Sequence, residues 1–180
     1  MEIEKTDIEG LLILRPRIFK DERGYFYESF NKTEFLKLGL NSEFDQDNQS
    51  LSKKDVLRGL HFQNPPHEQG KLVFVVSGSV LDVAVDIRKS SLTYGKHVSI
   101  NLSSENNTMF WIPPGFAHGF LALEDNTRFV YKCTKNYNKQ SEHGITWNDP
   151  ELDINWGTQN PIVSEKDQLL PNFKDFISSF

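Results

Sequence analysis

Residues 79–86 read SVLDVAVD, and this run indicates the fold more clearly than any other part of the chain. Side chains in a β-strand point to opposite faces with a period of two, so a strand divides its residues into two alternating sets. One set here is Val80, Asp82, Ala84 and Asp86, and the other is Leu81, Val83 and Val85. The pattern predicts a β-strand over Ser79 to Asp86.

Eight further short runs on either side of it are also strand-like, and many of them contain aromatic residues. They are Leu11 to Leu14, Gly24 to Phe30, Val56 to Phe62, Lys71 to Ser77, His97 to Leu102, Thr108 to Ile112, Gly119 to Ala122 and Arg128 to Thr134. Turn-forming residues separate these runs, at positions 21–24, 64–66, 77–79, 113–115 and 124–126. Many short strands at this spacing predict an all-β antiparallel sandwich or barrel of the jelly-roll type.

Helical segments are few and short. One is predicted over Lys32 to Leu38, where Asn31 can cap the first turn and Gly39 follows the end. Ser164 is placed to cap a second short helix.

The last ten residues, Pro171 to Phe180, contain three phenylalanines and an isoleucine. We therefore expect this tail to pack against the body of the protein or against a partner subunit.

Length and composition argue against several classes of protein. A chain of 180 residues is expected to form one domain, over residues 1–180, with a substantial core. The formal net charge of −5 argues against a nucleic-acid-binding surface. Cys133 is the single cysteine, so no disulfide can form within the chain, and a reducing compartment is expected. The acidic N-terminus is unlike a secretory signal, and no apolar run approaches the roughly 20 residues that span a bilayer. We expect a cytoplasmic protein that does not enter a membrane.

The stretch 56–71, VLRGLHFQNPPHEQGK, and the motif from Pro113 to His118 together raise the question of a metal site. The motif is similar to Pro-x-Gly-x-x-His of the cupin superfamily, whose jelly rolls commonly carry a metal. The ligands here would have to be His61, Gln63, Lys71 and His118. An ammonium group has no lone pair to donate, and an amide oxygen is a poor replacement for imidazole. We therefore predict that the scaffold is kept and that no metal is bound.

Without a metal, the same residues suit acid–base chemistry. His61 can act as a general base near neutral pH, and Lys71 can stabilise an oxyanion with its positive charge. Tyr131 lies in a strand-like run and can donate a proton across a pocket from His61. Each also has an ordinary alternative role, as a hydrogen-bonded histidine, a solvated lysine or a core aromatic residue.

Other polar residues are candidates for holding an anionic or sugar ligand. Arg23, Arg58 and Lys166 can bind phosphate groups, the arginines through a planar fork that matches anionic oxygens. Plain exposed charge is the alternative for all three. The amides within Gln46 to Ser50 offer donors and acceptors for a sugar or a base, and an ordinary turn explains that composition equally well.

Seven segments carry a more specific signal when they are taken in order. They are Asp21 to Glu28, Gln46 to Ser50, Leu57 to Gln63, Pro113 to Phe120, Tyr131 to Thr134, Trp147 to Pro150 and Ser164 to Asp167. Together they resemble the dTDP-4-dehydrorhamnose 3,5-epimerase family, over about Ile13 to Asp167. The resemblance implies a cupin-type double-stranded β-helix, which is a jelly roll with a few short helices, and an isomerase that acts on a dTDP-sugar.

The resemblance also implies a role for each matching residue. His61 would be the base that removes a proton, and Asp167 would fix its imidazole tautomer. Tyr131 would return a proton on the opposite face of the sugar, and Lys71 would stabilise the enolate oxygen. The residues that would bind the nucleotide and the sugar are Arg23, Phe26, Glu28, Gln46, Asn48, Arg58, His118, Tyr137, Glu142 and Lys166, with the ring of Tyr137 against the thymine.

The implied reaction converts dTDP-4-dehydro-6-deoxy-D-glucose to dTDP-4-dehydro-L-rhamnose by epimerisation at C3 and C5, as part of dTDP-rhamnose biosynthesis. Both carbons flank the C4 carbonyl, so a base and an acid on opposite faces can invert either centre through an enolate stabilised by a nearby cation. No cofactor is expected, and the family implies a homodimer that exchanges strands or termini. Two alternatives stay open: a related enzyme that inverts one centre or isomerises a keto sugar, and a non-catalytic sugar-nucleotide binding module.

Overall fold

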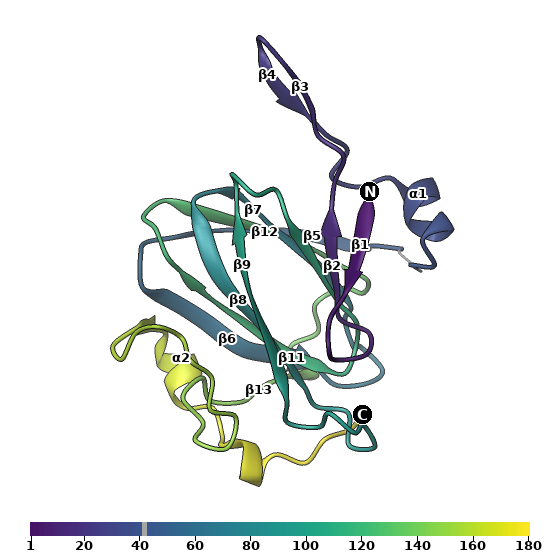
Figure 1. The fold of residues 1–180 in the computed structure, drawn as a ribbon. Coiled ribbons are helices and arrows are strands. Elements are labelled where there is room, and N and C mark those ends of the chain that lie inside the picture. Colours follow the sequence, from purple (N-terminus) through teal and green to yellow (C-terminus); the bar gives the residue numbers. More distant parts are fainter. Residues whose placement is uncertain (41–42) are drawn as a thin grey trace.

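The computed structural model describes residues 1–40 and 43–180. Most of its strands belong to two six-stranded sheets that face each other (Figure 1). In spatial order, the first sheet contains β1 (Glu2–Lys5), β2 (Leu12–Arg15), β10 (Met109–Ile112), β7 (Lys71–Ser77), β12 (Thr127–Cys133) and β5 (Gln46–Ser52). All its pairings are antiparallel.

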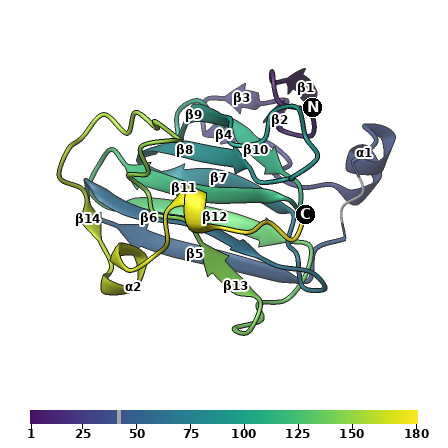
Figure 2. The same ribbon diagram turned by 90° about the horizontal axis from the view of Figure 1, so that it is seen from below.

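The second sheet has the order β13 (Glu142–Gly144), β6 (Val56–Gln63), β11 (Phe116–Ala122), β8 (Ser79–Asp86) and β9 (His97–Ser103). A sixth strand, β14 (Ile162–Val163), pairs in parallel with β6. Viewed from below, the strands of the two sheets form two layers (Figure 2). The predicted all-β jelly roll is therefore confirmed.

The run SVLDVAVD forms β8 with the predicted bounds, and both of its faces are buried. Val80 and Ala84 face the first sheet and pack into an inner core with Phe110 and Phe129. The alternate residues, which include Val83, face the other way. The two faces of β8 therefore pack against different sets of neighbours.

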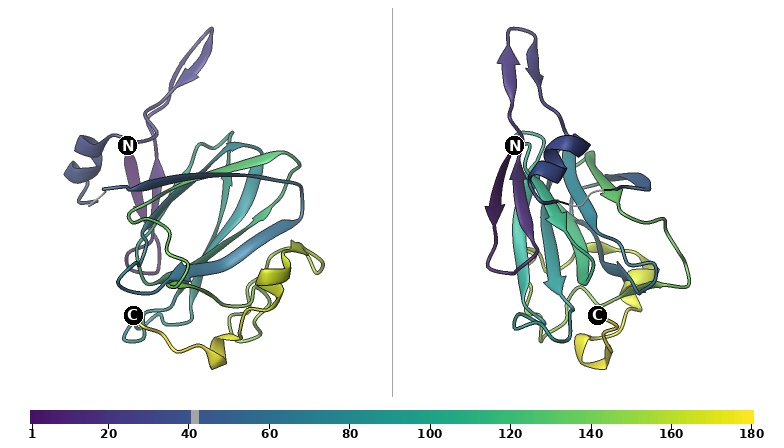
Figure 3. Two further views of the ribbon diagram at one scale, coloured as in Figure 1. Left: turned by 180° about the vertical axis from the view of Figure 1, so that it is seen from behind. Right: turned by 90° about the vertical axis from the view of Figure 1, so that its right-hand side faces the viewer.

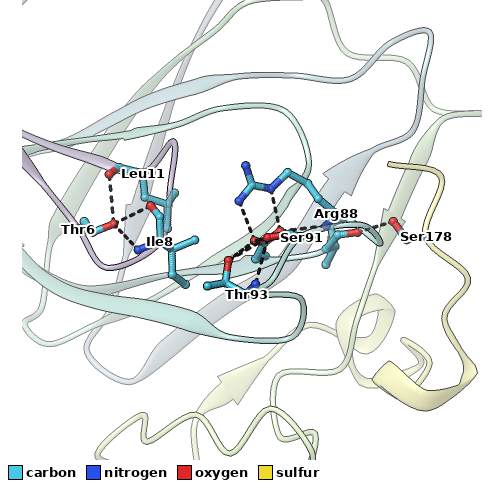
Figure 4. Close-up of polar contacts among 9 residues, drawn as sticks. Thr6, Ile8, Leu11, Arg88, Ser91, Thr93 and Ser178 are labelled. Atoms are coloured by element: carbon cyan, nitrogen blue, oxygen red, sulfur yellow. Dashed lines mark hydrogen bonds and ion pairs between the residues drawn. The ribbon is translucent and has the colours of Figure 1, made fainter.

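The outer face of the second sheet is covered by the C-terminal part of the chain. There the ring of Phe176 lies 5.2 Å from that of Phe62 on β6, and Phe173 lies in the single 3₁₀ turn, Phe173–Asp175, of the tail. The hydroxyl of Ser178 donates a hydrogen bond to the carbonyl of Ile87 (Figure 4). Of the two predicted alternatives, the body of the protein or a partner subunit, the aromatic tail packs against the body.

The helix α1 (Lys32–Lys37) covers one end of the outer face of the first sheet. The side chain of Asn31 caps it by accepting hydrogen bonds from the backbone N–H groups of Thr33 at 3.1 Å and Glu34 at 3.3 Å. Phe35 is fully buried against Trp111 and its neighbours. The predicted helix and its cap are confirmed.

Among the residues that the structure describes, no helix is long and apolar enough to cross a membrane.

A two-stranded hairpin, β3 (Phe19–Asp21) and β4 (Gly24–Phe26), extends away from the sheets (Figures 1 and 3). The predicted strand from Gly24 to Phe30 is wrong beyond Phe26, because the chain leaves the hairpin there and turns toward α1. Residues 46–50, for which a turn was an equal alternative, lie in β5 and pair with β12.

A buried carboxylate closes the loop that follows β8. Asp86 accepts hydrogen bonds from the Arg88 guanidinium at 2.9 and 2.7 Å. The hydroxyls of Ser91 and Thr93 donate to the same carboxylate at 2.6 Å each (Figure 4). Burial opposes ionisation, but these donors outweigh it and lower the pKa of Asp86 to about 2. The guanidinium also lies 4.5 Å from the ring centre of Phe116.

Candidate active site

A cleft lies between the two sheets and has two lobes. The main lobe, of about 510 Å³, is lined by Ser50, Val56, Leu57, Arg58, His61, Lys71, His118, Phe120, Phe129, Tyr131, Ile162, Val163, Ser164, Lys166 and Asp167. The second lobe, of about 320 Å³, is lined by Gln46, Asn48, His61, Phe62, Gln63, Gln69, Lys71, Tyr131, Tyr137 and Glu142. His61, Lys71 and Tyr131 line both lobes, so they lie where the lobes meet.

His61, on β6, is paired with a carboxylate from a distant part of the chain. Its Nε2 lies 2.7 Å from Oδ1 of Asp167, which is the third residue of the short helix α2 (Glu165–Gln168). The Asp167 side chain is 5% exposed, whereas the imidazole of His61 is 30% exposed. The carboxylate is thus covered by the protein, while the imidazole that it holds is open to the cleft.

Two local features hold the Asp167 carboxylate in place. Ser164 caps α2 by accepting a hydrogen bond from the Asp167 N–H at 3.1 Å, as predicted. The N–H of Gly59 points at Oδ2 from 3.4 Å. Gly59 has a φ of +128°, and a Cβ there would lie 2.5 Å from Cα of Gly119, so no larger residue fits. Burial opposes ionisation of Asp167, but hydrogen bonding with His61, the Gly59 N–H and Ser164 outweighs it and holds the pKa of the carboxyl below its ordinary value.

Lys71, the first residue of β7, places its ammonium group inside the protein beside β6. Its Nζ lies 3.4 Å from the backbone carbonyl oxygen of His61, which accepts a hydrogen bond. Burial lowers the pKa of Lys71, and the carboxylates of Asp82 and Glu142 oppose this shift. The arrangement puts a cation directly behind the histidine, on the wall of the main lobe.

Tyr131 reaches the cleft from the opposite wall to His61. It lies on β12 of the first sheet, in register with Val73 and Asn48, whereas His61 belongs to the second sheet. Burial raises the pKa of its phenol above the ordinary value, so the hydroxyl stays protonated. A base and a protonated acid therefore face the same cavity from two different sheets.

A second histidine–carboxylate pair lies deeper in the main lobe. His118 of β11 pairs in register with His61, and its Nε2 lies 3.0 and 3.1 Å from the two carboxylate oxygens of Asp82. Both side chains are almost completely buried. Burial lowers the pKa of His118, against the opposing effect of Asp82. Asp82 was not among the predicted site residues.

The second lobe is lined by a connected set of polar side chains. Tyr137 donates a hydrogen bond from its hydroxyl to Glu142 at 2.7 Å, and its backbone N–H donates to Oε1 of Gln46 at 2.7 Å. Gln46 in turn donates to Asn48 at 2.8 Å. Lys166 forms an ion pair with Glu142 at 2.6 Å. Burial raises the pKa of Glu142, but Lys166 and Tyr137 outweigh it and the net shift is downward.

Comparison with known proteins agrees with this geometry. Residues 5–175 match the family model described as dTDP-4-dehydrorhamnose 3,5-epimerase. The chain belongs to the dTDP-4-dehydrorhamnose 3,5-epimerase family. It is 55% identical to the enzyme of that name from Shigella flexneri over 168 residues, which cover 93% of each chain.

Solved structures of the same epimerase family superpose closely on the chain. The crystal structure of dTDP-4-dehydrorhamnose 3,5-epimerase from Elizabethkingia anophelis matches with a TM-score of 0.93 at 49% identity and covers 97% of both chains. The dTDP-6-deoxy-D-glucose-3,5-epimerase of Legionella pneumophila was solved in complex with dTDP-4-keto-L-rhamnose. It matches with a TM-score of 0.89 at 46% identity, over 96% of this chain and 98% of that one.

Three residues that the family resemblance assigned to substrate binding lie away from the cleft. Arg23 and Phe26 are exposed on the projecting hairpin, and Arg23 there forms an ion pair with Asp21. Glu28 is exposed beyond the hairpin and accepts a hydrogen bond from Asn31 at 3.1 Å. Within a single chain, the structure therefore does not bring these residues to the epimerase cleft, and their role stays a prediction.

Arg58 is the remaining basic residue of the main lobe. Its guanidinium donates to the hydroxyl of Ser52 at 3.3 Å and to the backbone carbonyl of Leu51 at 3.4 Å. These contacts orient the side chain along β5 at the rim of the lobe. With Lys166, it places two cations on the wall of one cavity.

The residues do not fit the metal site that other cupins carry. The position that would supply a ligand from β7 is Lys71, and Gln63 uses its amide to bind backbone groups of His67 and Asn138. Within residues 1–40 and 43–180, no three His, Cys, Asp or Glu side chains gather in a way that could hold a metal ion. An ammonium group and an amide that is already bound to the backbone are poor ligands for a metal ion.

Proposed function

We propose that this member of the family catalyses epimerisation at C3 and C5 of dTDP-4-dehydro-6-deoxy-D-glucose, which yields dTDP-4-dehydro-L-rhamnose without a cofactor. One observation carries the proposal. The His61–Asp167 pair, the Tyr131 phenol and the Lys71 ammonium all line a single cleft and come from both of its walls. A protein that only binds a sugar nucleotide has no need of a base and an acid on opposite sides of its ligand.

In the proposed first step, His61 removes the proton from C3 or C5. Asp167 holds Nε2 at 2.7 Å, and an ionised carboxylate favours the tautomer in which Nε2 carries the proton. The lone pair is then on Nδ1, which is the nitrogen left to accept the substrate proton. The lowered pKa of Asp167 keeps its carboxylate ionised and able to accept the Nε2 proton.

The enolate that results needs a positive charge beside its oxygen. Lys71 is the cation at the meeting point of the two lobes, and burial keeps competing water away from it. Such a preorganised charge commonly contributes several kcal/mol to the stability of a developing oxyanion. Tyr131, on the other wall, then returns a proton to the opposite face of the carbon, which inverts the centre.

The rest of the cleft has the chemistry of a nucleotide site. Arg58 and Lys166 are placed to bind the diphosphate. The ring of Tyr137 at the second lobe would pack against the thymine, while Gln46, Asn48 and Glu142 offer hydrogen bonds to the nucleoside and the sugar. His118 would contact the sugar from deep in the main lobe, in an orientation fixed by Asp82.

We further propose that two copies of the chain form the working unit. The exposed hairpin carries Arg23 and Phe26, two residues assigned to the substrate, on an arm that extends away from the two sheets (Figure 3). The outer face of the first sheet also exposes Leu51 and Val76, at 57% and 46%. A homodimer in which each hairpin reaches the cleft of its partner explains both features. A single domain over residues 1–180 and a cytoplasmic location stay predictions.

The test is proton NMR of dTDP-4-keto-6-deoxyglucose incubated with the protein in deuterium oxide. We expect loss of both the C3 and the C5 proton signals, with the rhamno-configured keto sugar trapped by an added reductase. Exchange at one carbon alone would indicate a single-centre epimerase instead. No exchange, with the nucleotide still bound, would show that the catalytic proposal is wrong for this sugar.

A further inference from the structure

The motif from Trp147 to Pro150 matches the family but contributes no residue to the lining of either lobe. Its aspartate, Asp149, is 3% exposed. One carboxylate oxygen, Oδ1, accepts the backbone N–H groups of Glu151 at 2.9 Å and Leu152 at 3.1 Å. The other, Oδ2, accepts the backbone N–H of Phe173 at 2.7 Å. The carboxylate therefore joins its own turn to a segment more than twenty residues further along the chain.

That segment is the continuation of the one that carries Asp167. Before α2, it is fixed to the second sheet by β14, where the N–H of Ile162 donates to the carbonyl of Asp55 at 2.7 Å. After α2, it is fixed at Pro171, whose carbonyl accepts from the N–H of Thr146 at 2.9 Å. The bond from Phe173 to Asp149 is the next attachment. Figure 1 shows α2 and the tail lying against the second sheet.

The space beneath this stretch allows little adjustment. A Cβ on residue 144 would lie 2.7 Å from Cδ1 of Leu170 and 2.6 Å from the carbonyl oxygen of Leu60, so Gly144 lets the chain pass close to β6. The helix α2 is four residues long, and a helix this short depends on its attachments for its position. The position of the Asp167 carboxylate therefore depends on what holds the two ends of the segment, as well as on its own contacts with Gly59 and His61.

We propose that Asp149 is a positioning residue, which acts on the reaction through Asp167 and His61. By binding the N–H of Phe173 it fixes the downstream end of the α2 segment, and this keeps the Asp167 carboxylate within hydrogen-bonding distance of the His61 imidazole. The predicted effect of Asp149 on turnover rests on the proposed function. The predicted effect of Asp149 on the tautomer of the His61 imidazole does not depend on the substrate.

The variants Asp149→Asn and Asp149→Ala test the proposal, with Glu151→Gln on the exposed face of the same turn as the matched control. Asp149→Asn keeps the size of the side chain and one oxygen, but replaces the other oxygen by a donor that cannot accept a hydrogen bond. The asparagine variant therefore stays informative if the alanine variant does not fold. Nitrogen-15 NMR of the histidine ring nitrogens reports the His61 tautomer without any substrate, and His61→Ala identifies the His61 signals.

We expect the wild type and Glu151→Gln to show His61 protonated at Nε2, and both Asp149 variants to move toward the mixed tautomers of Asp167→Ala. The rate of C3 proton exchange should fall by about tenfold, because a small displacement of a catalytic group costs up to about 10²-fold. Added to Asp167→Ala, the Asp149 substitution should change the rate by less than about twofold, since residues that act through one another are not additive.

A lower melting temperature with unchanged His61 signals and an additive loss of rate would overturn the proposal, because it would show a purely structural carboxylate. Failure of the reaction itself would look different. The wild type would then show no exchange, while the tautomer measurement would still decide the role of Asp149.

Discussion

Two carboxylates of this protein, Asp86 and Asp167, are both buried, yet their partners differ in kind. Asp86 is surrounded by groups that keep their protons: the Arg88 guanidinium and the hydroxyls of Ser91 and Thr93. Asp167 is bound to His61, a side chain that can gain or lose a proton and is open to the cleft. The first carboxylate can stabilise a loop, and the second can control the protonation of a base.

The difference teaches that burial alone does not mark a functional carboxylate. Both groups have a pKa below the ordinary value, and in both the hydrogen bonds outweigh the effect of burial. What separates them is whether the partner of the carboxylate titrates and faces a cavity. Substitutions at the two sites should therefore separate activity from stability.

Removal of the base itself should have the largest effect. In His61→Ala, exchange at both C3 and C5 should fall by about 10²–10⁴-fold, the contribution typical of a positioned general base. Binding of dTDP, measured by calorimetry, should remain close to that of the wild type. Full inversion activity in this variant would refute the proposed mechanism.

The matched pair Asp167→Asn and Asp86→Asn should separate the two carboxylates directly. Loss of a carboxylate that orients a functional histidine costs about 10–100-fold in activity, by analogy with such partners in metal sites. We expect that loss in Asp167→Asn and little change in the exchange rate of Asp86→Asn at 25 °C. Thermal unfolding should show the reverse order, with the larger fall in melting temperature in Asp86→Asn. Equal losses of activity in the two variants would break the comparison.

Most strands of the two sheets could be predicted from the sequence, including β6 and β12, which line the cleft, but β5 and several short strands could not. The bounds of β8 were predicted from its clear alternation, and those of β7 from an almost unbroken apolar run between turn residues. In β5, the residues at 46, 48 and 50 face the cleft and are polar, so their composition resembles that of a turn. The strands β13 and β14, with three and two residues, are too short for any periodicity.

The candidate site was predicted partly from its own residues and partly from the family resemblance. His61, Lys71 and Tyr131 were candidates from their chemistry alone, and the fold brings them together. Asp167 is 106 residues from His61, and a single sequence carries no direct sign of so distant a pair, so its role followed from the family resemblance. Asp82 was not predicted, although the sequence carried a signal for it. It is a carboxylate in the set of β8 residues that faces the inner core, where an unpartnered charge would be unfavourable.

Substitution of the acid should affect inversion more than proton exchange. Tyr131→Phe keeps the ring but removes the proton that inverts the centre, while His61 can still remove and return a proton on its own face. We expect inversion to fall by at least about 10²-fold, the lower end of the contribution of a general acid, and exchange to fall less. The ratio of the two rates is obtained from NMR in deuterium oxide with and without the trapping reductase. Equal losses would place Tyr131 outside the proton-return step.

The smallest expected effect is on the pH dependence of stability, and it tests the role of Asp86. The pKa of Asp86 is lowered from 3.8 to about 2 in the folded protein, so the folded state favours the charged form. Its contribution, roughly 2 kcal/mol for a shift of this size, is complete above the unfolded pKa and is lost as the pH falls toward 2. The difference in unfolding free energy between the wild type and Asp86→Asn, from urea titrations, should therefore be constant above about pH 5 and shrink below pH 4.

The variant Ser91→Ala sharpens this test, because it removes one of the donors that lower the pKa of Asp86. With fewer donors the folded-state pKa of Asp86 is lowered less. The loss of stability should therefore begin near the unfolded pKa as in the wild type, but it should be smaller and complete at a higher pH. Its exchange rate should equal that of the wild type, since none of these groups lines the cleft. A difference in unfolding free energy between the wild type and Asp86→Asn that does not depend on pH would mean that the carboxylate acts through its shape and not through its charge. The contrast between Asp86 and Asp167 would then rest on their positions alone.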